Sequence, residues 1–388
     1  MVAALRNSGV REVTNLLELA GERQGELMKL LAEMVNQDTP SREKNALDRF
    51  ADYLGQRLSD RGAEITLVRP VEAGNHVVAR VGGSEGEKPL LLLAHYDTVW
   101  PLGECERRPF RVEDGRAYGP GVFDMKAGLA MILMALDLAA AAGRRLAPLT
   151  IIANSDEEIG SLTSRPIIEE EAKKSRAVLV LEPAAPNGAL KTSRKGVGAF
   201  RLSVKGIPAH AGADPEKGAS AILELAHQVI RLHGLTDLAA GISVNAGVVS
   251  GGSRVNVIAA EAEAAIDLRV ATVAQADWAV AAIRGLQPVL AGTTLEVSGG
   301  MNRPPMESTP GNLALFEQTR DLGAELGLAL SAAGSGGGSD GNFTSALGIP
   351  TLDGLGAVGD GAHAYHEYVE VHRLPGRVAL LARLLEKL

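Results

Sequence analysis

The chain has 388 residues, a formal net charge of −8, 46% hydrophobic residues and only 3% aromatic residues. This length suits two or three domains, and the composition predicts an aliphatic core rather than disorder. The acidic balance excludes a nucleic-acid-binding protein, which needs a basic surface to bind phosphates, and a single cysteine, Cys105, excludes an intrachain disulfide.

Membrane and targeting segments are not indicated by the sequence. Residues 1–12 mix Arg and Glu without the apolar run of a signal peptide, and no apolar stretch is long enough to span a bilayer. We therefore expect a cytoplasmic protein that does not bind membranes.

The first half of the chain alternates predicted helices and strands. Apolar residues at helical spacing predict a helix from about Asn15 to Asn36, and Ser41 is the expected N-cap of a second helix that ends near Arg61. The later elements are strands at Glu64–Arg69, Asn75–Val81, Pro89–Ala94, Leu149–Ala153 and Ala177–Leu181, and a helix at Asp124–Ala142. Short, continuous apolar runs are typical of strands buried on both faces, so we predict an α/β sheet sandwiched by helices.

The middle of the chain has a different order of elements. They are a strand at Gly198–Lys205, a helix at Pro215–His233, strands at Ile242–Val249 and Glu261–Val270, a helix at Val273–Leu286 and a strand at Thr294–Ser298. This β-α-β-β-α-β order is that of a ferredoxin-like unit. The α/β pattern then resumes with a helix near Gly311–Gly327, a strand at Ile349–Leu352 and a helix at Pro375–Leu388. We predict a discontinuous domain of residues 1–194 and 302–388, with an inserted α+β domain of residues 195–301.

Histidines and carboxylates follow the buried strands of the first half. His95 and Asp97 come after one strand, Asp156-Glu157-Glu158 after another, and Glu182 after a third. Ligands bind outside the carboxyl ends of the strands in open α/β sheets, and imidazole with carboxylate is a ligand set of zinc. Three adjacent carboxylates also repel one another unless a cation lies among them. The joint placement therefore predicts a metal site.

Each residue alone also has an ordinary structural explanation. Asp124, which follows the Gly119-Pro-Gly121 turn, fits a helix N-cap. A single histidine after a strand is more often a hydrogen-bonded, partly buried residue than a ligand. The spacing of two between His95 and Asp97 places both on one face of an extended strand, so Asp97 is a candidate to orient the imidazole.

Several motifs occur in a fixed order along the chain. They are His95-Tyr-Asp97, Gly119-Pro-Gly-Val-Phe-Asp124-Met-Lys, Asp156-Glu157-Glu158-Ile-Gly160, Leu181-Glu182-Pro183 and His363-Ala-Tyr-His-Glu367-Tyr. In this order and spacing they resemble the aminoacylase/carboxypeptidase family of co-catalytic zinc metallopeptidases, most closely its glutamate carboxypeptidase (carboxypeptidase G-like) branch. The resemblance implies a zinc-peptidase catalytic domain with an inserted dimerisation domain, and hence a homodimer.

The resemblance implies roles for these residues around two Zn²⁺ ions per subunit, with Co²⁺ or Mn²⁺ as alternatives. Asp124 would bridge the ions, His95 and Glu182 would complete one site, and Glu158 and His363 the other. Glu157 would be the general base. The residues alone leave open which adjacent glutamate is the base and whether His363 or His366 is the ligand; the family pattern selects Glu157 and His363.

The insert carries further residues that the resemblance implies in substrate binding. His210 would reach into the partner's active site, and Asn256 and Arg269 would hold the substrate carboxylate, to which an arginine can bind through two hydrogen bonds. From the local sequence, Arg269 equally fits a surface cation in a salt bridge and His210 a loop histidine. We expect His76, His227, His233 and His372 to lie on strand or helix surfaces.

The expected activity is metal-dependent hydrolysis of an amide bond next to a free carboxylate, with release of a C-terminal amino acid, glutamate favoured. The substrate would be a small peptide or an N-acyl amino acid, and an N-acyl-amino-acid deacylase is the alternative. A serine hydrolase is a third hypothesis, because Gly337–Gly341 places Ser339 in a G-x-S-x-G pattern. A glycine-rich tract rather than a strand precedes that serine.

Overall fold

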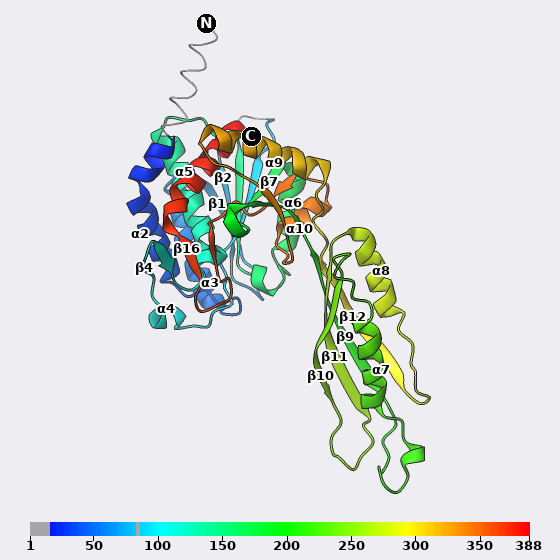
Figure 1. Cartoon of the computed structure of the whole chain (residues 1–388). Coiled ribbons are helices and arrows are strands. Elements are labelled where there is room, and N and C mark those ends of the chain that lie inside the picture. Colours follow the sequence, from blue (N-terminus) through cyan, green and yellow to red (C-terminus); the bar gives the residue numbers. More distant parts are fainter. Residues whose placement is uncertain (1–15, 83–85) are drawn as a thin grey trace. The chain divides into compact units, whose positions relative to one another are not determined.

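The computed structural model describes residues 16–82 and 86–388, so Asn15, the expected start of the first helix, lies outside the described part. The chain forms two compact units. Unit 1 combines the described residues up to Ser193 with Ser308–Ser335 and Ser339–Leu388, and unit 2 consists of Arg194–Glu307 and Gly336–Gly338 (Figure 1).

A six-stranded mixed sheet forms the centre of unit 1 (Figure 1). Its strands lie in the order β1 (Glu64–Val68), β2 (His76–Val81), β6 (Leu149–Asn154), β3 (Leu90–His95), β7 (Ala177–Val180) and β14 (Thr351–Leu352). Strands β6, β3, β7 and β14 run parallel to one another, whereas β2 is antiparallel to β6 and β1 is antiparallel to β2. The carboxyl ends of the four parallel strands therefore meet at one edge of the sheet.

Helices cover both faces of this sheet, as the continuous apolar runs predict. In β3, Leu90 and Leu92 belong to the core on one face, and Leu91 and Leu93 pack with Ile168 on the other. The first face carries α2 (Gln24–Val35), α3 (Lys44–Ser59), α5 (Ala127–Ala141), α9 (Pro310–Glu325) and α11 (Leu374–Lys387). The second face carries α6 (Arg165–Lys174), which contacts α10 (Gly341–Ala346). Each fully buried leucine stabilises the fold by about 1.5–3 kcal/mol relative to an exposed one.

Unit 1 also contains short elements that the sequence pattern does not predict. They are α4 (Glu104–Arg107), a sheet of β15 (Gly359–Asp360), β16 (Tyr368–Glu370), β5 (Arg116–Tyr118) and β4 (Arg111–Glu113), and a pair of β13 (Ala332–Ser335) with β8 (Leu190–Arg194). Most of these segments are too short and too mixed in polarity to show a periodic pattern.

Unit 2 has the ferredoxin-like order of elements. They are β9 (Gly196–Lys205), α7 (Ala221–His233), β10 (Ser243–Gly251), β11 (Glu261–Val270), α8 (Val273–Arg284) and β12 (Thr294–Arg303). The strands form an antiparallel sheet in the order β10-β11-β9-β12. Alternate residues of β11, such as Ile266 and Leu268, pack in the same core as Leu225 of α7 and Ile283 of α8. The predicted fold class is thereby confirmed.

Three predicted helix starts are wrong. The helix expected from Pro215 begins at Ala221, because Pro215–Lys217 forms a separate 3-10 turn. The second helix begins at Lys44 after Glu43, and the Ser41 hydroxyl instead donates to the Thr98 carbonyl, because the neighbouring Pro40 pairs with Thr98 in the segment that follows β3. The helix expected from Asp124 begins at Ala127. Asp124 itself has non-helical backbone angles (φ −116°, ψ 94°) in an irregular turn, Val122–Lys126, whose amides bond to a distant carboxylate described below.

Candidate metal centre

Three parallel strands deliver side chains to the same edge of the unit 1 sheet. His95 is the last residue of β3, Glu157 and Glu158 lie in a 3-10 turn that follows β6, and Glu182 lies just beyond β7. β3 pairs with both β6 and β7, so these side chains are neighbours. The convergence of these four residues follows directly from the strand order.

Asp124 lies between two imidazoles. Its Oδ1 is 3.1 Å from His95 Nε2, and its Oδ2 is 3.4 Å from His363 Nε2. His363 stands in the turn between β15 and β16, where His366 is exposed. The two oxygens of one carboxylate thus face two different histidines, which is the arrangement that a bridging ligand needs.

Each imidazole also faces a glutamate of its own. His95 Nε2 is 3.5 Å from Glu182 Oε1, and His363 Nε2 is 3.1 Å from Glu158 Oε2. Among the described residues, the donor atoms of His95, Asp124 and Glu158 lie within 4.8 Å of one another, as do those of His95, Glu157 and Glu182. Imidazole nitrogen and carboxylate oxygen at this spacing suit divalent transition metals.

Asp97 supports both sides of this cluster. His95 Nδ1 lies 3.0 Å from the Asp97 carbonyl oxygen and 3.4 Å from its Oδ1, which leaves Nε2 for the carboxylates. The same carboxylate accepts hydrogen bonds from the backbone amides of Glu157 at 3.1 Å and Glu158 at 3.2 Å. One fully buried aspartate therefore orients the histidine and holds the turn that carries both glutamates.

The carboxylates of the cluster favour positive charge on both sides of Asp124. Burial disfavours the charged imidazole of His95, but hydrogen bonds with Asp124, Asp97 and Glu182 raise its pKa well above the usual value. Hydrogen bonds with Asp124 and Glu158 raise the pKa of His363 to about 10. Burial raises the pKa of Glu158 to about 7, whereas the two imidazoles overcome the burial of Asp124 and hold its pKa well below the usual range. Two divalent cations would supply the charge that protons otherwise provide here.

Glu367 is a supporting residue to which the sequence patterns assign no role. Its buried carboxylate accepts hydrogen bonds from the backbone amides of Gly121, Phe123 and Asp124 and from the Trp100 indole. Burial raises the pKa of the Glu367 carboxyl, although the hydrogen bonds from the backbone amides act to lower it. The glutamate stands in the His363 motif, where it resembles one more ligand, and only the contacts show that it orients the backbone at Asp124.

His76 is buried, so the prediction of a surface histidine is wrong for this residue. Its Nδ1 accepts from the Ser155 backbone amide at 3.3 Å, and its Nε2 donates to the Thr163 hydroxyl at 2.9 Å. Thr163 in turn donates to the Asp156 carboxylate. His76 thus supports the turn that leads into Glu157, and burial lowers its pKa.

Two glycines permit a close approach at Glu182. A Cβ atom on Gly128 would lie 2.4 Å from the Leu181 carbonyl oxygen, and one on Gly356 would lie 2.3 Å from the same oxygen. Real Cβ atoms do not come so close to backbone oxygens. The start of α5 can therefore pack against the segment that carries Glu182 only because residue 128 has no side chain.

A hollow of about 370 Å³ adjoins the cluster of candidate ligands at Glu158. Its wall includes Val99, Trp100, Leu102 and Ile159, and of these Val99 and Leu102 are 44% and 49% exposed. The hollow is therefore largely apolar and open beside a candidate ligand.

The candidate substrate residues of the insert lie in unit 2. His210 is exposed, its Nδ1 accepts from the amides of Gly212 and Ala213, and Ala211 beside it donates to the carbonyl oxygen of Asn256. His210 and Asn256 are thus on neighbouring loops. Arg269 stands on β11, where its Nε donates to Asp267 at 3.0 Å. Their roles in substrate binding stay predictions.

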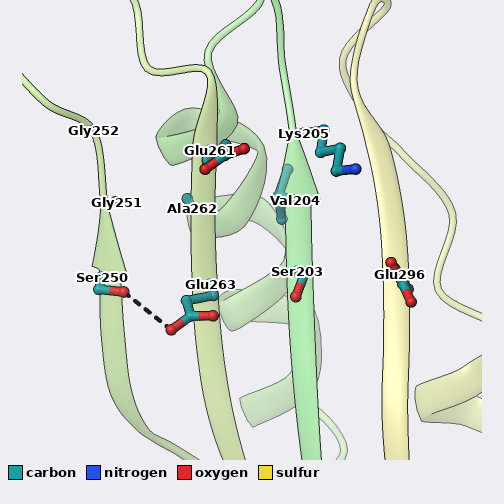
Figure 2. A pocket seen from close by; sticks show the side chains of 10 residues that line it. All are labelled: Ser203, Val204, Lys205, Ser250, Gly251, Gly252, Glu261, Ala262, Glu263 and Glu296. Carbon is teal, nitrogen blue, oxygen red and sulfur yellow. Dashed lines mark hydrogen bonds between the residues drawn. The ribbon is translucent and has the colours of Figure 1, made fainter.

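The hollow on the sheet of unit 2 has a different character. It has a volume of about 490 Å³ and lies across the strands on the side away from the helices (Figure 2). Its charged residues are Lys205, Glu261, Glu263 and Glu296, and Glu263 pairs with Arg201 at 2.9 Å. It lacks the imidazole and carboxylate combination of the unit 1 cluster.

Ser339 has contacts that suit a structural residue. It is fully buried, its hydroxyl donates to Asp353 at 2.6 Å, and the amide of Gly341 donates to the hydroxyl at 3.1 Å. A serine nucleophile needs a general base and access to substrate. The contacts of Ser339 therefore favour the metal-dependent hypothesis.

The sequence matches the peptidase family described as M20/M25/M40 over residues 91–387. The chain belongs to this family, which confirms the resemblance of its motifs, and it is a hydrolase of the metallopeptidase class. It is similar to carboxypeptidase G2 of Pseudomonas sp. (strain RS-16), with 32% identity over 95% of this chain and 91% of the relative. It is also similar to acetylornithine deacetylase of Myxococcus xanthus, with 31% identity over 60% of this chain and 63% of that enzyme.

Solved structures share the fold at lower identity. Aminopeptidase PepT of Bacillus cereus ATCC 10987 aligns with a TM-score of 0.78 and 22% identity over 94% of this chain and 98% of its own. The dinuclear metal-binding peptidase YXEP of Bacillus subtilis aligns with a TM-score of 0.66 and 17% identity over 95% of this chain and 100% of its own. Among the described residues, no helix combines the length and hydropathy needed to cross a bilayer.

Proposed function

We propose that this protein is a two-metal exopeptidase that hydrolyses the amide bond next to a free carboxylate and releases a C-terminal amino acid, with glutamate favoured. The observation that carries the proposal is Asp124, whose two carboxylate oxygens face His95 and His363. Each histidine also faces its own glutamate, so the cluster offers two adjacent metal positions with one shared anion.

The proposed metals are two Zn²⁺ ions per subunit, for which Co²⁺ or Mn²⁺ can substitute at imidazole and carboxylate ligands. His95, Asp124 and Glu182 would hold one ion, and Asp124, Glu158 and His363 the other. The bound ions supply Lewis acidity, which polarises the scissile carbonyl and lowers the pKa of water. Asp97 keeps Nε2 of His95 directed at the cluster.

Glu157 is proposed as the general base. Its backbone amide donates to Asp97, and its carboxylate lies beside His95 and Glu182. A carboxylate at this position can take a proton from the attacking water and pass it to the nitrogen of the leaving amine. Glu158, the next residue, would meanwhile serve as a ligand.

Three residues of unit 2 are proposed to bind the substrate. Arg269 is proposed to bind the free carboxylate, with Asn256 beside that group and His210 of the partner subunit on the scissile carbonyl. The acyl side of the substrate is assigned to the hollow beside Glu158, whose apolar wall suits a neutral group.

We further propose that residues 1–194 and 302–388 form the catalytic domain and residues 195–301 a dimerisation domain. β10 is an edge strand of the unit 2 sheet, and its Val248 and Val249 are 66% and 58% exposed. Edge strands have unpaired backbone groups that can pair with another strand. A second copy of this chain is the proposed partner, and light scattering in solution tests it.

The alternative function is deacylation of N-acyl amino acids. It is supported by the similarity to acetylornithine deacetylase and to succinyl-diaminopimelate desuccinylase of Verminephrobacter eiseniae (strain EF01-2). Both activities cleave an amide beside a carboxylate and would use the same cluster, so the identity of the acyl group separates them.

A substrate panel tests the proposal. N-acylated Glu, Asp and neutral amino acids, with acyl groups of increasing size, are assayed beside dipeptides that end in the same residues. We expect hydrolysis that a chelator abolishes and Zn²⁺ restores, with the highest kcat/KM for C-terminal glutamate. Equal rates for glutamate and neutral residues would contradict the proposed preference for glutamate. Hydrolysis that a chelator does not affect would contradict the metal mechanism.

A further inference from the structure

Arg108 contacts two neighbouring aromatic rings at the turn that carries His363. Its guanidinium carbon is 4.1 Å from the centre of the Trp100 ring and 4.9 Å from that of Tyr365, and the two ring centres are 5.2 Å apart. Arg108 Nη1 also donates to the Tyr365 carbonyl oxygen at 3.0 Å. Cation–π contacts and a charge-assisted hydrogen bond thus join the chain just after α4 to residues next to His363.

One side of this clamp is anchored in the protein. Arg108 Nε pairs with the carboxylate of Glu104, which is buried, and the buried Trp100 donates its indole N–H to Glu367 at 3.2 Å. The other side is Tyr365, a residue that is 76% exposed. The exposed tyrosine is therefore held mainly through Arg108 and Trp100, and not by a surrounding core.

His363 has a backbone conformation that needs such support. Its φ is +63°, in the left-handed region that residues with a Cβ atom rarely occupy. Its Nε2 must nevertheless stay 3.1 Å from Glu158 and 3.4 Å from Asp124. Metal–ligand distances tolerate only about 0.2 Å, so a small displacement of the turn would weaken this position.

We propose that Arg108 is a positioning residue, which holds Tyr365, fixes the His363 turn and so sets the affinity of the metal position formed by Asp124, Glu158 and His363. This inference rests on the proposed function, because it assumes the two metal positions. On the turn, Arg108 contacts only the His363 segment. The other metal position shares Asp124 but takes its remaining ligands, His95 and Glu182, from the ends of β3 and β7. The metal position at His95 and Glu182 is therefore expected to keep its affinity for zinc when the clamp is removed.

Zinc affinity is the readout. The full chain is stripped with a chelator and titrated with Zn²⁺ in competition with a chromophoric chelator, and the unmodified chain is expected to bind two equivalents. Arg108→Ala and Tyr365→Ala are each expected to weaken one equivalent by about 10- to 100-fold, the range for residues that orient a ligand, and to leave the other unchanged. His363→Ala identifies the affected position.

Two control variants separate the clamp from general effects. Tyr365→Phe keeps the ring and should retain the affinity of the unmodified chain. Arg111 also stacks on a tyrosine, 4.5 Å from the centre of the Tyr118 ring, but it lies outside the His363 turn. Arg111→Ala should therefore bind both equivalents of zinc normally. Thermal unfolding of the stripped proteins checks that Tyr365→Ala, at an exposed site, leaves stability unchanged.

Two results would overturn the inference. One is normal affinity for both equivalents in Arg108→Ala and Tyr365→Ala, and the other is an equal loss at both positions. If Arg108→Ala does not fold, Tyr365→Ala decides alone. An unmodified chain that binds no zinc would instead contradict the proposed function itself.

Discussion

The carboxylate of Glu367 accepts a hydrogen bond from the backbone amide of Asp124 at 3.0 Å. The same carboxylate accepts from the amides of Phe123 at 2.8 Å and Gly121 at 3.0 Å and from the Trp100 indole at 3.2 Å. This buried anion therefore orients the turn whose aspartate faces both imidazoles, and it does so without facing the metal positions as a ligand.

Glu367→Gln is predicted to weaken metal binding without removing a ligand. An amide has one acceptor oxygen and presents an NH₂ group to the remaining N–H donors, so part of the network would be lost. We expect zinc affinity to fall by about 10- to 100-fold and the free energy of unfolding to fall by about 1–3 kcal/mol. Zinc titration and denaturant unfolding measure both. Glu370→Gln, on β16, is the control, and normal zinc binding by Glu367→Gln would contradict the role.

Gly128→Ala is predicted to displace the segment that carries Glu182. The new Cβ atom would lie 2.4 Å from the Leu181 carbonyl oxygen, so α5 or that segment must move. We expect a loss of about 1–3 kcal/mol in the free energy of unfolding and weaker zinc binding at the His95 position. Gly25→Ala in α2, where a Cβ meets nothing within 4 Å, should be neutral or stabilising by up to about 1 kcal/mol. Equal stability of the two variants would refute the steric argument.

His76 is predicted to make stability depend on pH. Burial lowers the pKa of His76 in the folded chain, so below about pH 6.5 the unfolded chain takes up a proton that the folded chain resists. His76 therefore contributes to the free energy of unfolding above that pH. The contribution is lost as the pH falls, by at most about 1.4 kcal/mol per pH unit. Denaturant unfolding between pH 7.5 and 5.5 should show a smaller loss in His76→Gln. The exposed His372→Gln is the control and should follow the unmodified chain. Parallel curves for all three proteins would rule out the effect.

Arg269→Ala is predicted to raise KM for substrates with a free carboxylate. Loss of a charge-assisted hydrogen bond costs about 1.5–3 kcal/mol, which corresponds to about 10- to 150-fold in binding. The effect on kcat should be small, because the carboxylate keeps the same charge in the bound substrate and in the transition state. Arg201→Ala, which removes an arginine that pairs with Glu263 on the same sheet, is the matched control. An unchanged KM in Arg269→Ala would assign the carboxylate to another group.

The fold can be predicted where buried strands produce a recognisable apolar pattern in the sequence. Leu90–His95 and Leu149–Asn154 are buried on both faces, so their apolar runs are continuous, and their ends locate His95 and the Glu157-Glu158 pair. α6 was missed because it is mostly charged, with Ile168 and Ala172 as its buried apolar residues. An amphipathic helix of this length has too few apolar positions for a periodic pattern.

The supporting contacts of the site could not be predicted from the sequence. The conformation of Asp124 depends on Glu367, a residue 243 positions away, and nothing near Asp124 indicates that partner. His76 looked like a strand surface residue because its partners, Ser155 and Thr163, come from elsewhere in the chain. Residues that hold ligands in place are recognised by their contacts, whereas the candidate ligands themselves are recognised by type and position.

Zinc content and hydrolysis rate, both measured on one preparation of Glu157→Gln, test the proposed two-metal mechanism directly. If Glu157 is the base and the ligands are those proposed, this variant should bind two zinc ions as tightly as the unmodified chain. Its kcat on the best N-acyl glutamate or peptide substrate should fall by about 10²- to 10⁴-fold. Hydrolysis near the unmodified rate, or loss of a zinc ion with the substitution, would contradict the account.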